Sequence, residues 1–463
     1  MSANPPGTRF VIASGVHRLQ DVTPKDGQVF TGEPGAIMSG ARVLGSFSRE
    51  GGLWYVTGQT QEGFVHPDTW PGGIVLPGYD EDNRPEELFF DGVRLRHVAS
   101  KAEVRPGTWY FDYGADRIYL ADDPAGHLVE TSVADYAFSG GASGVVIENL
   151  TVVRYANPAQ LGAIDASRAR GWVIGSVDAS FNHGAGVSLG PGSRLHDSKM
   201  TYNGQIGLHA FDGSQGAPIL IEDNEIAHNP QLGYNWGWEA GGMKITGSTG
   251  TIVCNNWVHD NAGPGIWFDG FNHASTIESN LVEHNNNIGI FYEISYGPTE
   301  IRWNISRHNG AGQPGAAGAG ILIANSREVT VTGNAVDSNA RGIMVTMVNR
   351  ERGPDGMLET TNVVVRSNEI RMFEGTTGLV DETGNDAYYV SKGNRFEDNT
   401  YYLDDPGAYR FLWTGRWWPA YTWQQWRSFG HDVQGDVRSA AEEPAINASL
   451  VFHCGRYGPA PGS

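Results

Sequence analysis

Two acidic residues near the middle of the chain have a spacing that could support chemistry. Asp269 ends the stretch Gly-Ile-Trp-Phe-Asp, and Glu293 ends the similar stretch Gly-Ile-Phe-Tyr-Glu 24 residues later. Two neighbouring carboxyl groups can divide a reaction, because one can act as a nucleophile or base while the other donates a proton. When they lie about 5 to 5.5 Å apart, the pair suits cleavage of a glycosidic bond with retention at the anomeric carbon. Two like charges that close also raise the pKa of one carboxyl group, as a general acid requires.

A repeat in the sequence indicates which elements position this pair. A glycine followed by an aliphatic residue recurs every 21 to 35 residues, and asparagine pairs five residues apart recur with it. Self-similarity on this scale, with runs that alternate like strands, is typical of stacked strand-and-turn coils. Asparagine suits the turns because it tolerates left-handed backbone and its amide can bond to a stacked neighbour. We therefore predict an all-β fold, a parallel solenoid, from the glycines Gly186, Gly207, Gly242, Gly265, Gly289, Gly320 and Gly342 and the pairs Asn224/Asn229, Asn256/Asn261, Asn280/Asn285, Asn304/Asn309 and Asn334/Asn339.

The glycine markers also predict which side chains point outward. The residue after each marker is aliphatic and side chains alternate along a strand, so the second and fourth residues after it face outward. Asp269 and Glu293 both occupy the fourth position, in successive coils. Neighbouring parallel strands are about 4.8 Å apart, so we expect the two carboxyl groups to lie roughly 5 Å apart. In the alternative interpretation, the pair belongs to an ordinary solvated face.

Candidate binding residues surround the predicted pair. Trp267 and Phe291 occupy the second position after their markers and could give a sugar ring an apolar platform. Lys244, one coil before Asp269, could lower the pKa of the Asp269 carboxyl group through its charge. A long insert after Asn229 could add a subsite wall, or it could simply pack its own aromatic rings. The other candidates are Tyr234, Trp236, Trp238 and Glu239 in this insert, His183 and His209 in the predicted groove, and Asn272 after Asp269.

Three further histidines each precede a repeat asparagine. They are His228, His284 and His308. We expect them to stack in turns rather than bind a metal, because no Asp/Glu cluster completes a set with zinc-like spacing.

The repeat resembles that of the right-handed parallel β-helix proteins over roughly residues 140 to 400. This resemblance implies a scaffold that pectate lyases, polygalacturonases and other polysaccharide-active enzymes share. A narrower resemblance, to the β-xylosidases of glycoside hydrolase family 120, implies an aspartate nucleophile at Asp269 and a glutamate acid/base at Glu293. The residues that match this pattern are Gly265, Ile266, Trp267 and Asp269, followed by Glu293 and Ser295.

The repeat divides the chain into four regions. Residues 1–44 are predicted to form the first coils, and residues 45–133, where hairpin-like alternation replaces the repeat, an inserted small β subdomain. Residues 134–400 are predicted to form the main β-helix, and residues 401–463 a C-terminal cap and tail, because a terminal coil must cover its open end. We expect the cap tryptophans to seal the core, with sugar binding as the alternative. These are Trp417, Trp418, Trp423 and Trp426.

Composition limits the classes of partner. The formal net charge is −20, which argues against nucleic acid and anionic membranes and, without a bridging cation, against polyanionic glycans. No run of about 18 apolar residues could span a membrane. The N-terminal stretch lacks the pattern of a secretory signal, and we favour an extracellular protein whose signal has been removed over a cytoplasmic one. We expect Cys254 to be a buried thiol, with a disulfide to Cys454 as the alternative.

Three functions are compatible with these residues. The first is a glycoside hydrolase that acts on an oligo- or polysaccharide without a cofactor, with Asp269 as nucleophile or base and Glu293 as acid. The second is a polysaccharide lyase or uronate epimerase, in which Lys244 abstracts a proton and Glu239, Asp269 and Glu293 hold calcium. The third is a non-catalytic carbohydrate-binding solenoid. We favour hydrolysis, because elimination gives no particular role to Trp267.

Overall fold

The computed structural model describes residues 4–211, 216–350, 352–353, 356–413 and 417–442. Its strands fall into two compact units. The first consists of the chain up to Gly190 with Ser198–His209 and His228–Gly241; the second consists of Pro191–Asp197, Ala210–Ala227 and the chain from Gly242 onward. Within the described part of the chain, no helix is long and apolar enough to cross a membrane.

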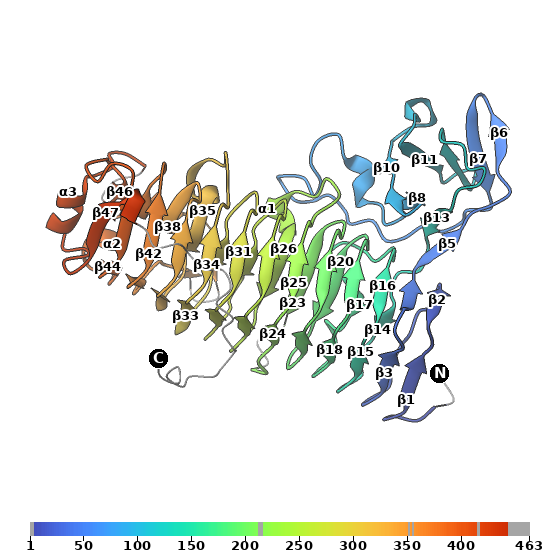
Figure 1. Cartoon of the computed structure of the whole chain (residues 1–463), viewed down its shortest axis with the longest axis horizontal. Helices are drawn as coiled ribbons and strands as arrows, with labels where there is room; N and C mark the ends of the chain where they lie inside the picture. The colour runs from blue at the N-terminus through green and yellow to red at the C-terminus, as the bar shows by residue number, and fades with distance from the viewer. Residues whose placement is uncertain (1–3, 212–215, 351, 354–355, 414–416, 443–463) are drawn as a thin grey trace. The chain divides into compact units, whose positions relative to one another are not determined.

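The second unit is a stack of coils whose strands form three parallel sheets (Figure 1). Successive strands pair in register, so that Val253, Ile277 and Ile301 lie opposite one another. This is the parallel solenoid that the repeat predicts. The first sheet contains β21 (Arg194–His196), β24 (Leu220–Glu222), β27 (Ile252–Cys254), β30 (Thr276–Glu278), β33 (Thr299–Arg302), β36 (Val329–Thr332), β41 (Val364–Arg366) and β44 (Arg395–Glu397). The second contains β25 (Glu225–Ala227), β28 (Trp257–His259), β31 (Leu281–Glu283), β34 (Ile305–Arg307), β37 (Ala335–Asp337), β42 (Glu369–Met372), β45 (Thr400–Leu403) and β47 (Asp436–Ser439). The third contains β26 (Gly241–Thr246), β29 (Ile266–Asp269), β32 (Ile290–Glu293), β35 (Ala319–Ala324), β38 (Arg341–Met347), β43 (Thr377–Asp381) and β46 (Phe411–Leu412).

The first unit has the same three-sheet arrangement. Its coils pair in parallel, for example Phe30 with Ile147 and Ile147 with Ile174. The sheets contain β1 (Arg9–Ile12), β3 (Val29–Gly32), β15 (Val146–Glu148) and β18 (Val173–Gly175); β2 (Gly15–Arg18), β4 (Ala36–Ser39), β16 (Thr151–Val153), β19 (Asp178–Ser180) and β22 (Lys199–Thr201); and β14 (Phe138–Ser139), β17 (Gly162–Asp165), β20 (Ala185–Leu189) and β23 (Ile206–Phe211).

Between β5 (Ala41–Val43) and β13 (Val129–Ser132), the chain leaves the coils and forms two small sheets. Most of their strands pair antiparallel, as the alternation in residues 45–133 indicates, and they enclose a core around Leu88, Trp109 and Phe111. One sheet has the order β10 (Arg96–His97), β11 (Thr108–Asp112), β12 (Arg117–Leu120), β7 (Leu53–Thr57) and β6 (Ser48–Glu50); the other has the order β5, β13, β8 (Leu88–Phe90) and β9 (Val93–Arg94).

A ladder of buried asparagines joins the coils of the second unit. The Oδ1 atom of Asn280 accepts hydrogen bonds from the backbone N–H and from Nδ2 of Asn256, both at 3.0 Å. The predicted bonding between stacked amides is therefore confirmed. The left-handed turn residue is the one before the ladder position, such as Ser279 with φ of 57°, so the expectation that the asparagine itself is left-handed is wrong. The ladder contains Asn224, Asn256, Asn280, Asn304, Asn334, Asn368 and Asn399.

The three histidines before repeat asparagines occupy left-handed turns. His284 and His308 both have φ of 55°, and their rings stack with centroids 5.0 Å apart. His228, which belongs to the first unit, has φ of 58° and stacks on Tyr202 at 4.7 Å. All three histidines therefore lie in turns as predicted, and the predicted stacking between them is present for His284 and His308.

The C-terminal part of the described chain gathers aromatic side chains around α3 (Trp423–Ser428). Trp423 and Trp426 are buried against Phe411, as predicted for residues that seal the core. Trp418 is exposed, so the expectation that it seals the core is wrong; its neighbour Trp417 is partly buried.

Cys254 is completely buried in β27. It is disulfide-bonded, which corrects the expectation of a free buried thiol. Cys454 lies outside the described residues.

Candidate active site

Three adjacent strands of the second unit, β26, β29 and β32, carry the predicted catalytic residues. Lys244 lies opposite Trp267, and Trp267 lies opposite Phe291, so the predicted column of outward residues is in register. Asp269 and Glu293 are the last residues of β29 and β32. Each paired residue of β29 lies opposite the residue of β32 whose number is 24 higher. Asp269 and Glu293 also differ by 24, so these two residues hold the same position in successive coils. The separation of about 5 Å between their carboxyl groups stays a prediction.

Asp269 forms an ion pair with Lys244. The distance from Lys244 Nζ to Asp269 Oδ2 is 2.8 Å, and the ammonium group also stands 3.8 Å from the centroid of the Trp267 ring. Lys244 is buried, whereas 21% of the Asp269 side chain is exposed. A buried ammonium group needs such partners, because burial without them is costly. The contact that the sequence predicted between Lys244 and Asp269 is therefore present, and it leaves Asp269 partly open to solvent.

Glu293 is held by two groups. The indole Nε1 of Trp267 donates to Glu293 Oε1 at 2.8 Å, and the guanidinium of Arg350 forms an ion pair with Oε2. Only 4% of the Glu293 side chain is exposed. Arg350 comes from the loop after β38, two strands further along the sheet, and nothing in the repeat pattern indicated it.

The aromatic residues of the outward column are covered. The rings of Trp267 and Phe291 stack with centroids 5.7 Å apart and planes 13° apart, and both are buried in a hydrophobic cluster. Ala316, in the 3-10 turn Gly315–Gly318 before β35, and Trp417 pack against that cluster. The expectation of an open sugar platform is therefore wrong, because both rings are buried within this cluster. The contact that Trp267 makes toward the site is its hydrogen bond to Glu293.

Asn272 is a structural residue rather than an open binding group. It is completely buried, and its Oδ1 accepts from the backbone N–H and the hydroxyl group of Ser248. Its Nδ2 donates to the carbonyl oxygen of Asp269 at 3.0 Å and contacts Ser295 Oγ at 3.1 Å. The sequence prediction of substrate binding does not fit this position, because the amide is used within the coil stack. Asn272 instead fixes the backbone at Asp269.

The remaining polar candidates belong to the first unit. Glu239 ends the short helix α1 (Trp236–Glu239) with φ of 135°, a strained value for a residue with a side chain. Its Oε2 accepts from Gln160 Nε2 at 2.8 Å and lies 4.0 Å from Nε2 of His209. The structure thus brings Glu239 and His209 together, with both side chains partly exposed.

The aromatic candidates of the long insert are mostly packed. Tyr234 is buried, and its hydroxyl group lies 2.8 Å from Nε2 of His183. His183 is also buried, with Nδ1 2.7 Å from Oε1 of Glu87, so its predicted place in an open groove is wrong. Trp238 is half-buried and stacks on Tyr234 at 6.0 Å. The alternative in which the insert packs its own rings therefore holds for Tyr234 and Trp238, and Trp236 is half-buried.

Comparison with known proteins identifies the architecture. A family model described as the right handed beta helix region matches residues 162–313. The solved complex of XylC with xylose is similar, with a TM-score of 0.67 and 14% identity, over 96% of this chain and 82% of that one. A glycoside hydrolase structure has a TM-score of 0.44 and 11% identity, over 84% of this chain and 89% of that one. No curated protein sequence matches the chain. At these identities the likeness establishes the fold, a right-handed parallel β-helix.

Proposed function

We propose that the protein is a glycoside hydrolase that cleaves an oligo- or polysaccharide with Asp269 and Glu293 as its catalytic pair. The observation that carries this proposal is their common position at the ends of two adjacent parallel strands. Strands about 4.8 Å apart suit a retaining mechanism, in which the two carboxyl groups lie about 5 to 5.5 Å apart. The similarity of the fold to XylC, which was solved with xylose, makes xylo-oligosaccharides the first substrates to test.

In this mechanism, Asp269 attacks the anomeric carbon while protonated Glu293 donates its proton to the leaving oxygen. Glu293 then removes a proton from water, which attacks the same carbon and releases Asp269. Lys244 orients the Asp269 carboxylate through Oδ2, and Trp267 orients Glu293 through Oε1. A carboxylate paired with a guanidinium cannot donate a proton, so substrate binding must displace Arg350 from Glu293.

Elimination by a lyase is the alternative, with Lys244 as the base. A base must be neutral, whereas Lys244 stands 2.8 Å from a carboxylate oxygen and over an indole ring, two partners suited to an ammonium group. These contacts favour a role for Lys244 in orienting Asp269, and with it hydrolysis over elimination.

The test compares Asp269→Asn and Glu293→Gln with the wild type on neutral and uronic oligosaccharides. Reducing ends report hydrolysis, and the absorbance of unsaturated sugars reports elimination. We expect hydrolysis by the wild type and a loss of at least about 100-fold in each variant, the scale of acid–base catalysis. Full turnover in both variants would rule out the catalytic pair, and calcium-dependent unsaturated product would favour a lyase.

Glu283→Gln is the matched control for Glu293→Gln. Glu283 ends β31 in the second sheet, is buried, and has the same kinds of partner: Trp257 Nε1 at 2.9 Å and Arg307 at 2.6 Å. Its substitution removes an equivalent ion pair and hydrogen bond, so we expect a similar change in stability with unchanged kcat.

A further inference from the structure

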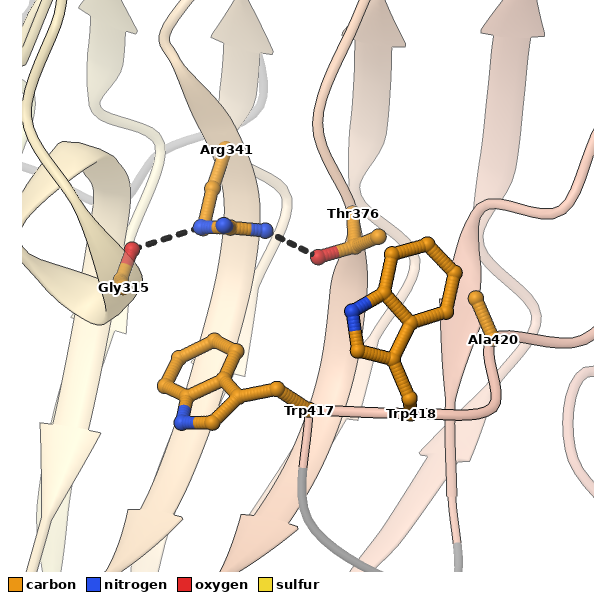
Figure 2. Close-up of a pocket in the computed structure, with 6 residues that line it drawn as sticks. All are labelled: Gly315, Arg341, Thr376, Trp417, Trp418 and Ala420. Atoms are coloured by element: carbon orange, nitrogen blue, oxygen red, sulfur yellow. Dashed lines mark hydrogen bonds between the residues drawn. The ribbon is translucent and has the colours of Figure 1, made fainter.

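A cavity of about 340 Å³ in the second unit lies outside the catalytic set (Figure 2). Two of the tryptophans that the sequence assigned to the cap contribute to its wall. One wall, Trp417 and Ala420, packs against the hydrophobic cluster that holds Trp267 and Phe291. The lining residues are Gly315, Arg341, Thr376, Trp417, Trp418 and Ala420.

The guanidinium of Arg341 is held in one orientation at this cavity. Its Nε donates to the carbonyl oxygen of Gly315 and its Nη1 to Thr376 Oγ1, both at 2.5 Å, from opposite ends of the group (Figure 2). The guanidinium carbon lies 5.1 Å from the centroid of the Trp417 ring. An arginine side chain has five N–H donors, so these two bonds leave three for another partner.

Arg341 has no acidic partner within the described part of the chain. Both of its hydrogen bonds go to neutral oxygens, and partial burial lowers its pKa. The nearby carboxylate of Glu382 accepts instead from Trp417 Nε1 at 3.3 Å. A half-buried cation of fixed orientation with donors to spare suits an anion with two oxygens, because a guanidinium pairs with a carboxylate through two parallel hydrogen bonds.

Trp418 supplies a second recognition element. Its side chain is 78% exposed, and its ring stands at the edge of the cavity near Thr376 (Figure 2). The face of an indole ring is electron-rich, so it attracts the polarised C–H groups on the face of a pyranose ring. An exposed tryptophan beside a half-buried cation therefore combines a surface for a sugar ring with a partner for a negative charge.

We propose that this cavity binds a sugar residue that carries a carboxylate, with Arg341 on the carboxylate and Trp418 against the ring. The inference rests on the proposed function in one respect: the acidic residue would be part of the oligosaccharide cleaved at Asp269 and Glu293.

The cavity and the catalytic pair are connected through the third sheet. Ile290 lies opposite Ile321, which lies opposite Ile343, so Arg341 is two strands from Glu293 and five residues lower along them. With about 4.8 Å between strands and about 3.3 Å per residue, that separation is roughly 19 Å. One sugar cannot span this distance, so the substrate class is an oligosaccharide with an acidic residue several units from the cleaved bond.

The test is titration calorimetry on the full chain, with three probes: a neutral xylo-oligosaccharide, the same oligosaccharide with one glucuronic acid, and free glucuronate. For the wild type we expect the acidic oligosaccharide to bind at least ten times more tightly than the neutral one. Arg341→Gln should abolish this preference without weakening binding of the neutral probe. Arg341→Lys should restore it only in part, since lysine keeps the charge but not the paired donors. Trp418→Ala should weaken binding of both oligosaccharides.

The controls are substitutions of two exposed residues outside the cavity, Arg366→Gln for the arginine and Tyr409→Ala for the aromatic residue. Tyr409 is 62% exposed. Equal affinity of the wild type for the acidic and neutral oligosaccharides would overturn the proposal, as would a preference that survives Arg341→Gln. Free glucuronate binding as tightly as the acidic oligosaccharide would overturn the assignment of an oligosaccharide as the substrate class, because the neighbouring sugar units would then add nothing to binding. This test measures binding and does not depend on catalysis. If Asp269→Asn were fully active and the catalytic proposal failed, the preference for the acidic oligosaccharide would still stand.

Discussion

At the scale of single residues, the contacts of Glu293 recur elsewhere in the second unit. Trp267 and Arg350 hold Glu293, and Trp257 and Arg307 hold Glu283 in the same manner. A glutamate that contacts a tryptophan and an arginine in this way therefore also has a structural role, because its contacts join neighbouring coils. Unlike Glu283, Glu293 lies beside Asp269, which ends the adjacent strand. The proposed catalytic role of Glu293 therefore depends on this pairing.

The variant Trp267→Phe tests whether the indole N–H orients Glu293. Phenylalanine keeps the stacking on Phe291 but removes the hydrogen bond to Oε1. We expect kcat to fall by about 10-fold or more with KM nearly unchanged, because a charge-assisted hydrogen bond contributes about 1.5 to 3 kcal/mol. Trp257→Phe loses the equivalent bond to Glu283 and should leave kcat unchanged. A fall in kcat of the same size in both variants would show a general effect on the fold.

At the scale of elements, the inserted β region of the first unit is joined to the long insert by buried polar contacts. Asp82 Oδ2 accepts from the backbone N–H of Gly233 at 2.6 Å, and the chain of contacts from Glu87 through His183 ends at Tyr234. Burial is the main reason that the pKa of Asp82 is raised to about 6. These contacts fix the segment that leads into α1, which carries Glu239.

This raised pKa predicts a pH-dependent stability. Between pH 4 and 6, Asp82 keeps its proton in the folded protein but loses it when unfolded, where its pKa is about 3.9. The folded state then binds more protons, so the contribution of Asp82 to the free energy of unfolding falls by about 3 kcal/mol as pH rises through this window. Asp82→Asn should remove that fall while keeping an acceptor for Gly233. Urea unfolding at pH 4 and pH 7 measures this fall in the free energy of unfolding, and Asp404→Asn, at an exposed position, is the control. Equal pH dependence of the wild type and Asp82→Asn would contradict the prediction.

At the scale of the whole molecule, the sequence predicts the coil stack because each coil repeats the same local requirements. The register that places Lys244 opposite Trp267 follows directly from the glycine spacing. The residues that cover the outward face do not follow from this spacing, because Ala316 and Trp417 pack against the cluster that contains Trp267 from segments outside the repeat. For the same reason, the contact of Arg350 with Glu293 has no signal in the sequence.

The asparagine ladder predicts where the stack can be weakened. Asn280→Ala would leave the buried backbone N–H of Asn256 without its acceptor, and it would also remove the bonds that the Asn280 side chain makes with Asn256 Nδ2 and with the carbonyl oxygen of Val253. Each unsatisfied buried group costs about 1 to 3 kcal/mol, so we expect the free energy of unfolding to fall by about 3 kcal/mol or more. The neighbouring Asn286 is exposed, so Asn286→Ala should change the free energy of unfolding by less than about 0.5 kcal/mol. Similar losses from both variants in urea unfolding would show that the ladder does not stabilise the stack.

The central claim is that Asp269 and Glu293, at the ends of adjacent strands, act as a retaining pair. The anomeric form of the first sugar released, followed by NMR before mutarotation, tests it most directly. Carboxyl groups one strand spacing apart leave no room for a water molecule between them and the sugar, so the account predicts a product with the same anomeric configuration as the substrate. Release of the inverted anomer would contradict it.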